Sequence, residues 1–154
     1  MYFRTSSRGT YKNVERKGPF WENYNETIKM TSDPRINSLL DQANQLFLKK
    51  KFSEAISFYK EILDSDPHNN SALNNIGYAF SKTGNYEQAL SYYKKGLELY
   101  QNDVSLLINI ISCLRKLKDL PNALNYCNKV LEKFPNYNVV LYHKERILAS
   151  LLKF

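Results

Sequence analysis

The sequence predicts an all-α fold built from stacked helical hairpins, and three observations predict it. Apolar residues between Asn70 and Asp103 recur at the spacing of amphipathic helices. Thr83-Gly84-Asn85 interrupts that spacing where one helix must reverse into the next. The segments on either side repeat the pattern with a period of 34 residues. Because one hairpin buries too little apolar surface alone, we expect the hairpins to pack against one another.

Composition and charge are those of an ordinary globular chain. The 154 residues are 43% hydrophobic and 24% charged, which is enough for one domain with a core. No apolar run is long enough for a membrane helix, and the first residues lack the apolar segment of a secretory signal, so we expect a cytoplasmic protein. The Arg- and Ser-rich start leaves an organelle transit peptide as the alternative. Cys113 and Cys127 are predicted to be buried, reduced thiols.

Three windows, residues 36–69, 70–103 and 104–137, align without gaps. Equivalent positions hold Ala43, Gly77 and Ile111; Leu46, Phe80 and Leu114; Phe52, Tyr86 and Leu120; and Ala55, Ala89 and Ala123. This length and pattern resemble the tetratricopeptide repeat (TPR) family, and the resemblance implies a right-handed α-solenoid. Lys50 and Lys118 replace the turn glycine of the family pattern, and Ile111 replaces its small crossing residue, so local packing should differ there.

Helix boundaries can also be placed from the sequence. Asp33-Pro34 is typical of an N-cap followed by a first-turn proline, which predicts a helix from about residue 34 to 49. Ser53 should begin the second helix, and the repeat domain should span 34–154. Residues 138–154 are predicted to form a solubilising cap. That segment mixes apolar Leu141, Leu148, Leu151 and Leu152 with charged Lys144, Glu145 and Lys153.

Residues 1–33 form a basic, aromatic N-terminal extension in which a short helix is expected at 19–30. Trp21, Tyr24 and Ile28 would share one face of that helix and cover the exposed flank of the first repeat, or dock on another molecule. The net charge is +3 over residues 1–35, −1 over 36–103 and +5 over 104–154, so both ends are basic. The simpler alternatives are that the tail is a mobile segment and that the cations lie on a solvated surface.

The TPR resemblance implies that the first helices of successive repeats line a concave surface that receives a partner peptide. Polar residues of the third repeat follow one helical face, at Ser105, Asn109, Ser112 and Lys116. Asn75 and Asn109 are equivalent, which looks like the asparagine ladder of TPR arrays that bind peptide backbones with side-chain amides. The candidate binding residues are Asn44, Asn75, Tyr78, Asn109, Arg115, Tyr142, His143 and Arg146.

A second TPR class clamps a C-terminal carboxylate with cations and asparagines. Asn44 and Asn75 fit that pattern, but Leu40, Ser105 and Asn109 stand where cations are required, so we reject this clamp. The chain has no P-loop, HExxH, GxSxG or dinucleotide-binding glycine motif. We therefore expect no enzyme activity, no cofactor and no metal.

The interpretation we favour is an adaptor that binds a peptide segment of a partner protein, with Asn44, Asn75 and Asn109 contacting its backbone. One alternative is an RNA- or ribonucleoprotein-associated factor that uses the basic tail and the basic C-terminal half. Another is a self-assembling scaffold, a homo-oligomer joined through the N-terminal segment.

Overall fold

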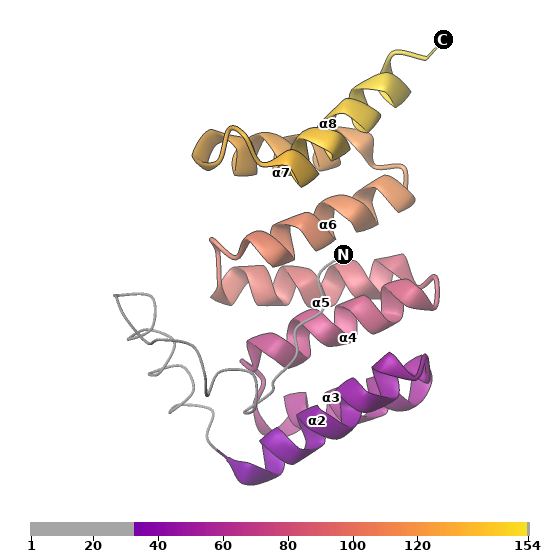
Figure 1. Ribbon diagram of the computed structural model, residues 1–154, viewed down its shortest axis with the longest axis vertical. Helices are drawn as coiled ribbons and strands as arrows, with labels where there is room; N and C mark the ends of the chain where they lie inside the picture. Colours follow the sequence, from indigo (N-terminus) through magenta and orange to yellow (C-terminus); the bar gives the residue numbers. More distant parts are fainter. Residues whose placement is uncertain (1–32, 154) are drawn as a thin grey trace.

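The computed structural model describes residues 33–153, and within them it contains seven α-helices and no strand. The helices are α2 (Pro34–Leu48), α3 (Phe52–Ser65), α4 (Asn70–Lys82), α5 (Tyr86–Leu99), α6 (Val104–Lys116), α7 (Leu120–Lys133) and α8 (Asn138–Leu151). Each helix packs mainly on its neighbours in sequence, and the hairpins form one elongated stack (Figure 1). The all-α solenoid prediction is confirmed.

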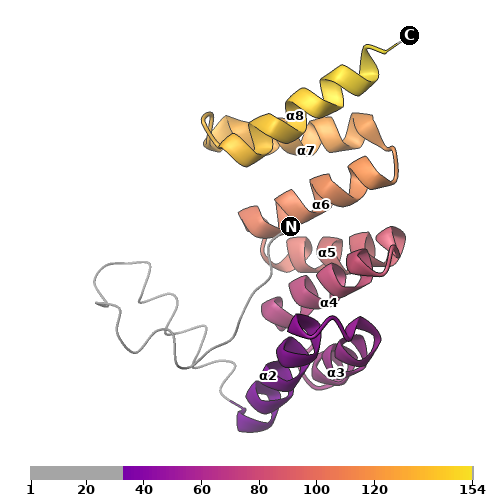
Figure 2. The ribbon, with the colours of Figure 1, turned by 45° about the vertical axis from the view of Figure 1, so that its right-hand side comes forward.

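The stack has two kinds of helix and two kinds of connection. We call α2, α4, α6 and α8 the A helices, and α3, α5 and α7 the B helices. The A–B turns lie along one edge of the stack and the B–A loops along the opposite edge (Figure 1). The turned view in Figure 2 keeps the same order of helices along the stack. Equivalent residues of successive repeats therefore lie in rows across the molecule.

Side-chain caps fix where three of the A helices, α2, α4 and α6, begin. The Asp33 carboxylate accepts a hydrogen bond from the Arg35 backbone N–H at 2.9 Å, with Pro34 in the first turn, as predicted. Asn69 caps α4 and Asp103 caps α6 in the same way. The sequence boundaries hold within one residue, since α2 ends at Leu48 rather than Lys49 and α3 begins at Phe52 rather than Ser53.

The A–B turns share one left-handed residue. Gly84 adopts φ +81°, and the equivalent Lys50 and Lys118 adopt φ +60° and +63°. In the first turn the Lys51 N–H bonds to the Leu46 carbonyl at 2.9 Å, and the other two turns repeat this bond. This is the Schellman arrangement, which requires a left-handed residue after the helix cap. The two lysines therefore occupy the glycine conformation that the sequence comparison indicated.

The core is built from side chains that interlock between A and B helices. A Cβ atom added at Gly77 would lie only 2.5 Å from Cε1 of the fully buried Tyr93, so the α4–α5 crossing requires glycine. Cys113 and Cys127 are buried free thiols, as predicted. Burial raises the pKa of Cys113 to about 12 and that of Cys127 to about 11, which keeps both thiols protonated.

Helix α8 differs from the solubilising cap that the sequence suggested. Val140 and Ile147 bury its inner side, but Leu141 and Leu148 are exposed, and Leu152 is 68% exposed. The equivalent residues of the preceding repeat, Leu107 and Leu114, are buried. No B helix follows α8 among the described residues, so its outer side is partly apolar.

Two further expectations concern other parts of the fold. The helix predicted at 19–30, with its apolar stripe, lies outside the described residues. None of the helices in residues 33–153 combines the length and apolar character that crossing a membrane requires.

Candidate functional site

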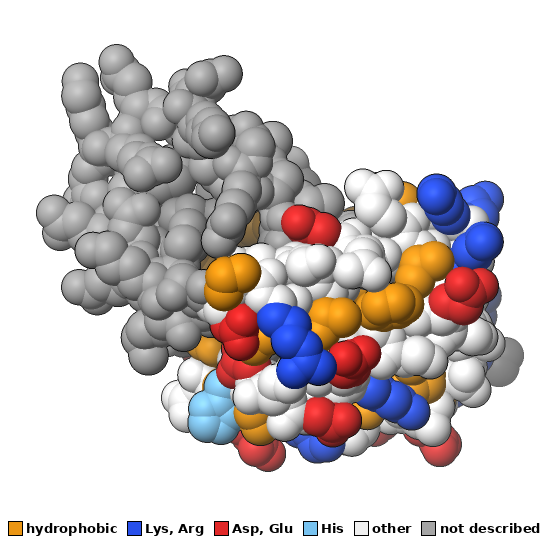
Figure 3. Space-filling model, turned by 90° about the horizontal axis from the view of Figure 1, so that it is seen from below, with side chains coloured by type: hydrophobic (Ala, Val, Ile, Leu, Met, Phe, Trp, Pro, Cys, Tyr) orange, Lys and Arg blue, Asp and Glu red, His pale blue; other side chains and the backbone are white. Residues whose placement is uncertain are grey.

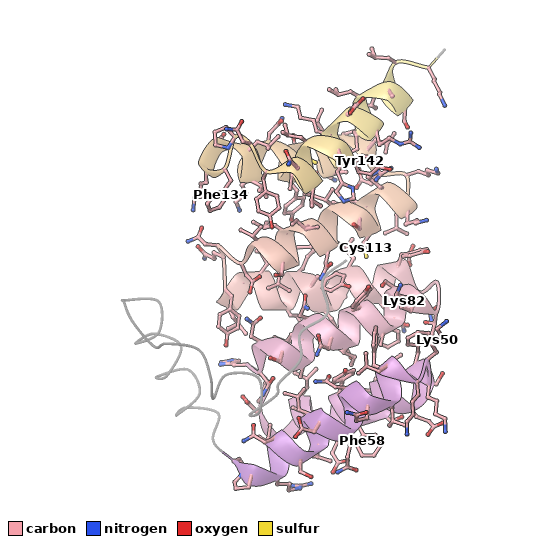
Figure 4. All side chains as sticks on the ribbon, in the orientation of Figure 1. Lys50, Phe58, Lys82, Cys113, Phe134 and Tyr142 are labelled. Atoms are coloured by element: carbon pink, nitrogen blue, oxygen red, sulfur yellow. The ribbon has the colours of Figure 1, made fainter. Side chains whose placement is uncertain are left out.

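The A helices together form one face of the stack, which we call the A-helix face, and all eight candidate residues lie on these helices. Each A helix contributes side chains at equivalent positions, because the repeats are in register. The helices run across this face one above another, and Tyr142 of α8 lies toward its C-terminal end (Figure 4). The face divides into an asparagine network over α2, α4 and α6 and a charged aromatic cluster on α6 and α8.

Asn44 is the centre of the first part of the network. Its side-chain oxygen accepts a hydrogen bond from the Tyr59 hydroxyl at 2.6 Å and another from Asn75 Nδ2 at 3.1 Å. All three side chains are buried. Burial raises the pKa of Tyr59, so the phenol stays protonated and remains a donor. The bonds connect α2, α3 and α4 across the first repeat boundary.

A second pair repeats this connection one repeat further along. Asn109 Nδ2 of α6 donates to Asn74 Oδ1 of α4 at 2.8 Å, and both side chains are fully buried. A buried amide that lost its partner would destabilise the fold by about 1–3 kcal/mol. The network therefore holds consecutive A helices in register.

This arrangement corrects the expected asparagine ladder. We expected Asn44, Asn75 and Asn109 to offer amides on a hydrated surface, but the structure buries all three. Asn75 and Asn109 are also bonded to different neighbours rather than aligned for one ligand. The physical reason is that amides at a close helix crossing satisfy one another instead of water.

Four candidate residues do come together at the C-terminal end of the face. Arg115 Nη1 of α6 lies 2.9 Å from His143 Nδ1 of α8. The centres of the Tyr142 and His143 rings lie 5.9 Å apart, and the Arg146 guanidinium lies 6.0 Å from the centre of the Tyr142 ring. Tyr142 is 55% exposed and Arg146 is also exposed. We call Arg115, Tyr142, His143 and Arg146 the α6–α8 cluster.

The charge state of His143 follows from its surroundings. Burial, and to a smaller extent the neighbouring Arg115 guanidinium, lower the pKa of His143 to about 4. The ring is therefore neutral at pH 7, and its Nδ1 accepts the hydrogen bond that Arg115 donates. The cluster presents two guanidinium charges beside an exposed phenol.

Tyr78 occupies the middle of the face but is only half-buried. The centre of its ring lies 5.1 Å from the centre of the Phe47 ring, and Lys82 Nζ lies 5.1 Å from the centre of the Tyr78 ring. The structure thus places Tyr78 apart from the α6–α8 cluster, among side chains of the first two repeats. Its position suits packing between the repeats with one edge open to solvent.

Sequence reasoning missed two partners in the network. Tyr59 lies at a core position of a B helix. The sequence alone does not indicate that its hydroxyl donates a hydrogen bond to a residue of the neighbouring A helix. Asn74 was visible as a polar neighbour of Asn75, but only the structure shows that it is the residue that pairs with Asn109. Within the part of the chain that the structure describes, no group of His, Cys, Asp or Glu residues is placed to hold a metal ion.

Two tetratricopeptide repeat family models match the chain, one over residues 71–103 and the other over residues 107–137. A TPR repeat-containing protein of Picosynechococcus sp. is 32% identical over 54 residues. That stretch covers 35% of this chain and 14% of the relative, so this chain matches only a small part of that protein.

Solved TPR domains resemble the whole stack. The first TPR of Spaghetti (RPAP3) bound to an HSP90 peptide has a TM-score of 0.72 at 23% identity, over 77% of this chain and 94% of that one. The second TPR domain of human RPAP3, in complex with an HSP70 peptide, has a TM-score of 0.67 at 22% identity, over 71% and 92%. The Sgt2 TPR domain from Aspergillus fumigatus has a TM-score of 0.70 at 20% identity, over 77% and 80%.

Proposed function

Because the chain belongs to the tetratricopeptide repeat family, we propose that it is a protein-interaction adaptor that binds a segment of a partner protein on its A-helix face. The family matches support this kind of activity, and two solved domains of similar fold carry a bound peptide. The low identity to those domains leaves the ligand of this chain to be argued from its own residues.

The α6–α8 cluster is the observation that supports a binding site at the C-terminal end of the face. Exposed tyrosine and arginine side chains are enriched where proteins bind one another, since each combines a large contact area with polar groups. Tyr142 has a guanidinium beside its ring and more than half of its surface open. The hydrogen bond between His143 and Arg115 holds the neighbouring His143 ring in place. A partner segment would place an apolar or aromatic side chain on Tyr142 and an acceptor at Arg146.

The asparagines have a different part in this proposal. Asn44, Asn75 and Asn109 hold the repeats in register and so give the face a fixed shape. Leu40 and Asn109, which stand where a carboxylate clamp needs cations, are both buried. We therefore propose an internal segment of the partner, rather than a chain terminus, as the ligand.

A peptide selection tests the proposal. The full chain is immobilised and challenged with a random peptide library, and enriched peptides are measured against Tyr142→Ala combined with Arg146→Ala. The expected result is a loss of affinity of roughly tenfold or more, as for the removal of an interface anchor.

The chain offers matched control residues for this experiment. Phe134→Ala removes another exposed aromatic side chain, and Lys95→Ala removes a cation that also lies over a tyrosine ring, that of Tyr92. Peptides that bind the Phe134→Ala and Lys95→Ala controls as tightly as the wild type, but bind the Tyr142 and Arg146 variant more weakly, would support the proposed site. A library that yields no ligand, or ligands that bind the Tyr142 and Arg146 variant as tightly as the wild type, would contradict it.

A further inference from the structure

Positive charge gathers on the edge of the stack that carries the A–B turns. Six exposed lysines lie in these turns or in the last turns of the A helices: Lys49, Lys50, Lys51, Lys82, Lys116 and Lys118. Figure 4 shows Lys50 and Lys82 on this edge, and Figure 3 shows it from the α2 end, with Lys and Arg gathered at the right-hand margin. We call these six residues the lysine edge.

The opposite edge is acidic. The last turns of the B helices and the loops after them carry Asp64, Asp66, Glu98, Asp103 and Glu132. Each edge also carries charges of the other sign. Glu54 and Glu87 begin α3 and α5 and Asp119 caps α7 on the lysine edge, and Lys133 ends α7 on the acidic one. The excess of each sign is nonetheless on opposite sides of the molecule.

Helix dipoles explain only part of this separation. Cations are favourable at the C-termini of helices, which accounts for Lys82 in α4 and Lys116 in α6. Cations would also be favourable at the C-termini of α3, α5 and α7. These ends carry the acidic residues Asp64, Glu98 and Glu132. Since A and B helices run in opposite directions, their dipoles alone would leave both edges of mixed sign.

Two of the lysines occupy a backbone conformation that disfavours them. Lys50 and Lys118 have φ +60° and +63°, whereas the equivalent residue of the second repeat is Gly84. A side chain with a Cβ is strained in this left-handed region, and glycine is not. The turn therefore accepts glycine, yet two of its three copies carry a lysine at an exposed tip.

The lysine edge is also free to meet a ligand. Within residues 33–153 none of the six lysines takes part in an ion pair, and the ion pair found there, Arg35–Glu61, lies elsewhere. Lys82 lies over the Tyr78 ring, which leaves its charge exposed. A row of unpaired cations at successive repeats attracts an extended anionic chain.

We propose that the lysine edge binds an acidic segment of a partner protein that runs across successive A–B turns. A single-stranded nucleic acid is the less suitable ligand, because it needs exposed rings on which bases stack. The rings beside this edge are engaged in packing: Tyr78 is packed against Phe47 and lies under Lys82. Phe52 and Tyr86, which begin α3 and α5, are half-buried against the core. This inference rests on the proposed function in taking a protein segment as ligand, but it uses a different surface.

The test measures binding of two labelled probes to the full chain by fluorescence anisotropy, a short poly-glutamate peptide and an oligouridine of similar length. The variant is Lys50→Gly combined with Lys118→Gly, which keeps the turns intact because glycine suits their conformation. The matched control, Lys94→Ala with Lys129→Ala, also removes two exposed lysines, but from the middle of α5 and α7. Both variants lower the net charge of +7 by the same amount.

The expected result is that the wild type and the control bind the peptide alike, that the edge variant binds it roughly fivefold more weakly, and that added salt weakens all three. Equal weakening in both variants would show an effect of net charge alone and overturn the proposal. Tighter binding of the oligouridine than of the peptide would overturn it in favour of nucleic acid, and no binding of either probe would overturn it outright. Because Tyr142 and Arg146 are untouched here, peptides selected on the A-helix face should bind the edge variant normally, so the two proposals can fail separately.

Discussion

Asn44 is the side chain on which the buried hydrogen bonds between the first two repeats converge. Its oxygen accepts from Tyr59 and from Asn75, and no water is needed to satisfy either donor. Asn44→Ala leaves both donors without this acceptor in a buried site, so we expect a loss of about 2–3 kcal/mol in the free energy of unfolding. Urea unfolding followed by circular dichroism measures it.

The exposed Gln42 of the same helix provides the comparison. Gln42→Ala also shortens an amide side chain in α2, but within residues 33–153 the bond of that amide is to exposed Ser38. It should change the free energy of unfolding little. Equal effects of the two substitutions would show that Asn44 does not hold the repeats together.

Gly77 makes a separate prediction about the crossing of α4 and α5. Alanine usually stabilises a helix relative to glycine by about 1 kcal/mol. Here the added Cβ would meet the Tyr93 ring at 2.5 Å, and because that ring is fully buried, its displacement would disturb the packed core. Gly77→Ala should therefore lower the free energy of unfolding by about 1–3 kcal/mol despite its helix propensity.

Gly96 tests the same reasoning with a softer neighbour. A Cβ there would lie 3.0 Å from Leu106 Cδ1, the end of a flexible side chain, so Gly96→Ala should cost less than Gly77→Ala. Thermal unfolding of both variants ranks them. The reverse order would contradict the account of the crossing.

His143 gives the fold a dependence on pH. Its pKa is about 4 in the folded chain, below the ordinary value of 6.5, so the unfolded chain binds the proton more readily between these values. The stability that neutral His143 contributes is present above about pH 6.5 and is lost as the pH falls toward 4. His143→Asn, the residue that the second and third repeats carry at this position, should flatten that part of the stability profile. Urea unfolding from pH 7 to pH 4 measures the slope, and an unchanged slope would be inconsistent with a depressed pKa.

The residue scale is where sequence reasoning was least complete. The repeat register located Asn75 and Asn109 on the A helices, but register alone cannot show whether an amide meets water or another amide. That depends on how closely consecutive A helices approach, and a partner such as Tyr59 comes from a different helix. The pairing of Arg115 with His143 likewise joins residues in two repeats.

At the scale of elements, the A–B turn gives the clearest prediction. Lys50→Gly and Lys118→Gly each relieve a strained left-handed lysine, so each should raise the free energy of unfolding by about 0.5–1 kcal/mol. Equilibrium unfolding of each variant measures the gain. The control is Lys49→Gly, which lies one residue earlier at φ −81° and should be destabilising. If Lys50→Gly lowered the free energy of unfolding as Lys49→Gly does, the argument from backbone strain would be wrong.

Elements were largely predictable from sequence because their signals are local. Asp33, Pro34 and the turn at Gly84 mark helix starts and reversals by chemistry that acts within a few residues. Helix α8 was less predictable, since a mixed pattern of leucines and charges does not reveal which side is covered. Only the stack shows that Val140 and Ile147 face inward while Leu141 and Leu148 are exposed.

At the scale of the whole molecule, the period of 34 residues places equivalent side chains of successive repeats in rows along the stack. The inner positions of the A helices form the buried asparagine network, the C-terminal repeats form the α6–α8 cluster, and the A–B turns form the lysine edge. The period predicted the stack itself, because three matching hairpins have one consistent way to bury their apolar faces. The separation of charge between edges was hidden in the sequence, where basic turns and acidic loops alternate.

The most direct test of the adaptor proposal is to map where a selected peptide binds. An isotope-labelled full chain is titrated with the peptide, and the shifts of its backbone amide signals are followed by nuclear magnetic resonance. The account predicts that the largest shifts fall in α6 and α8 around Arg115, Tyr142 and Arg146, with little change in the B helices. Shifts concentrated on α3, α5 and α7 instead would contradict it.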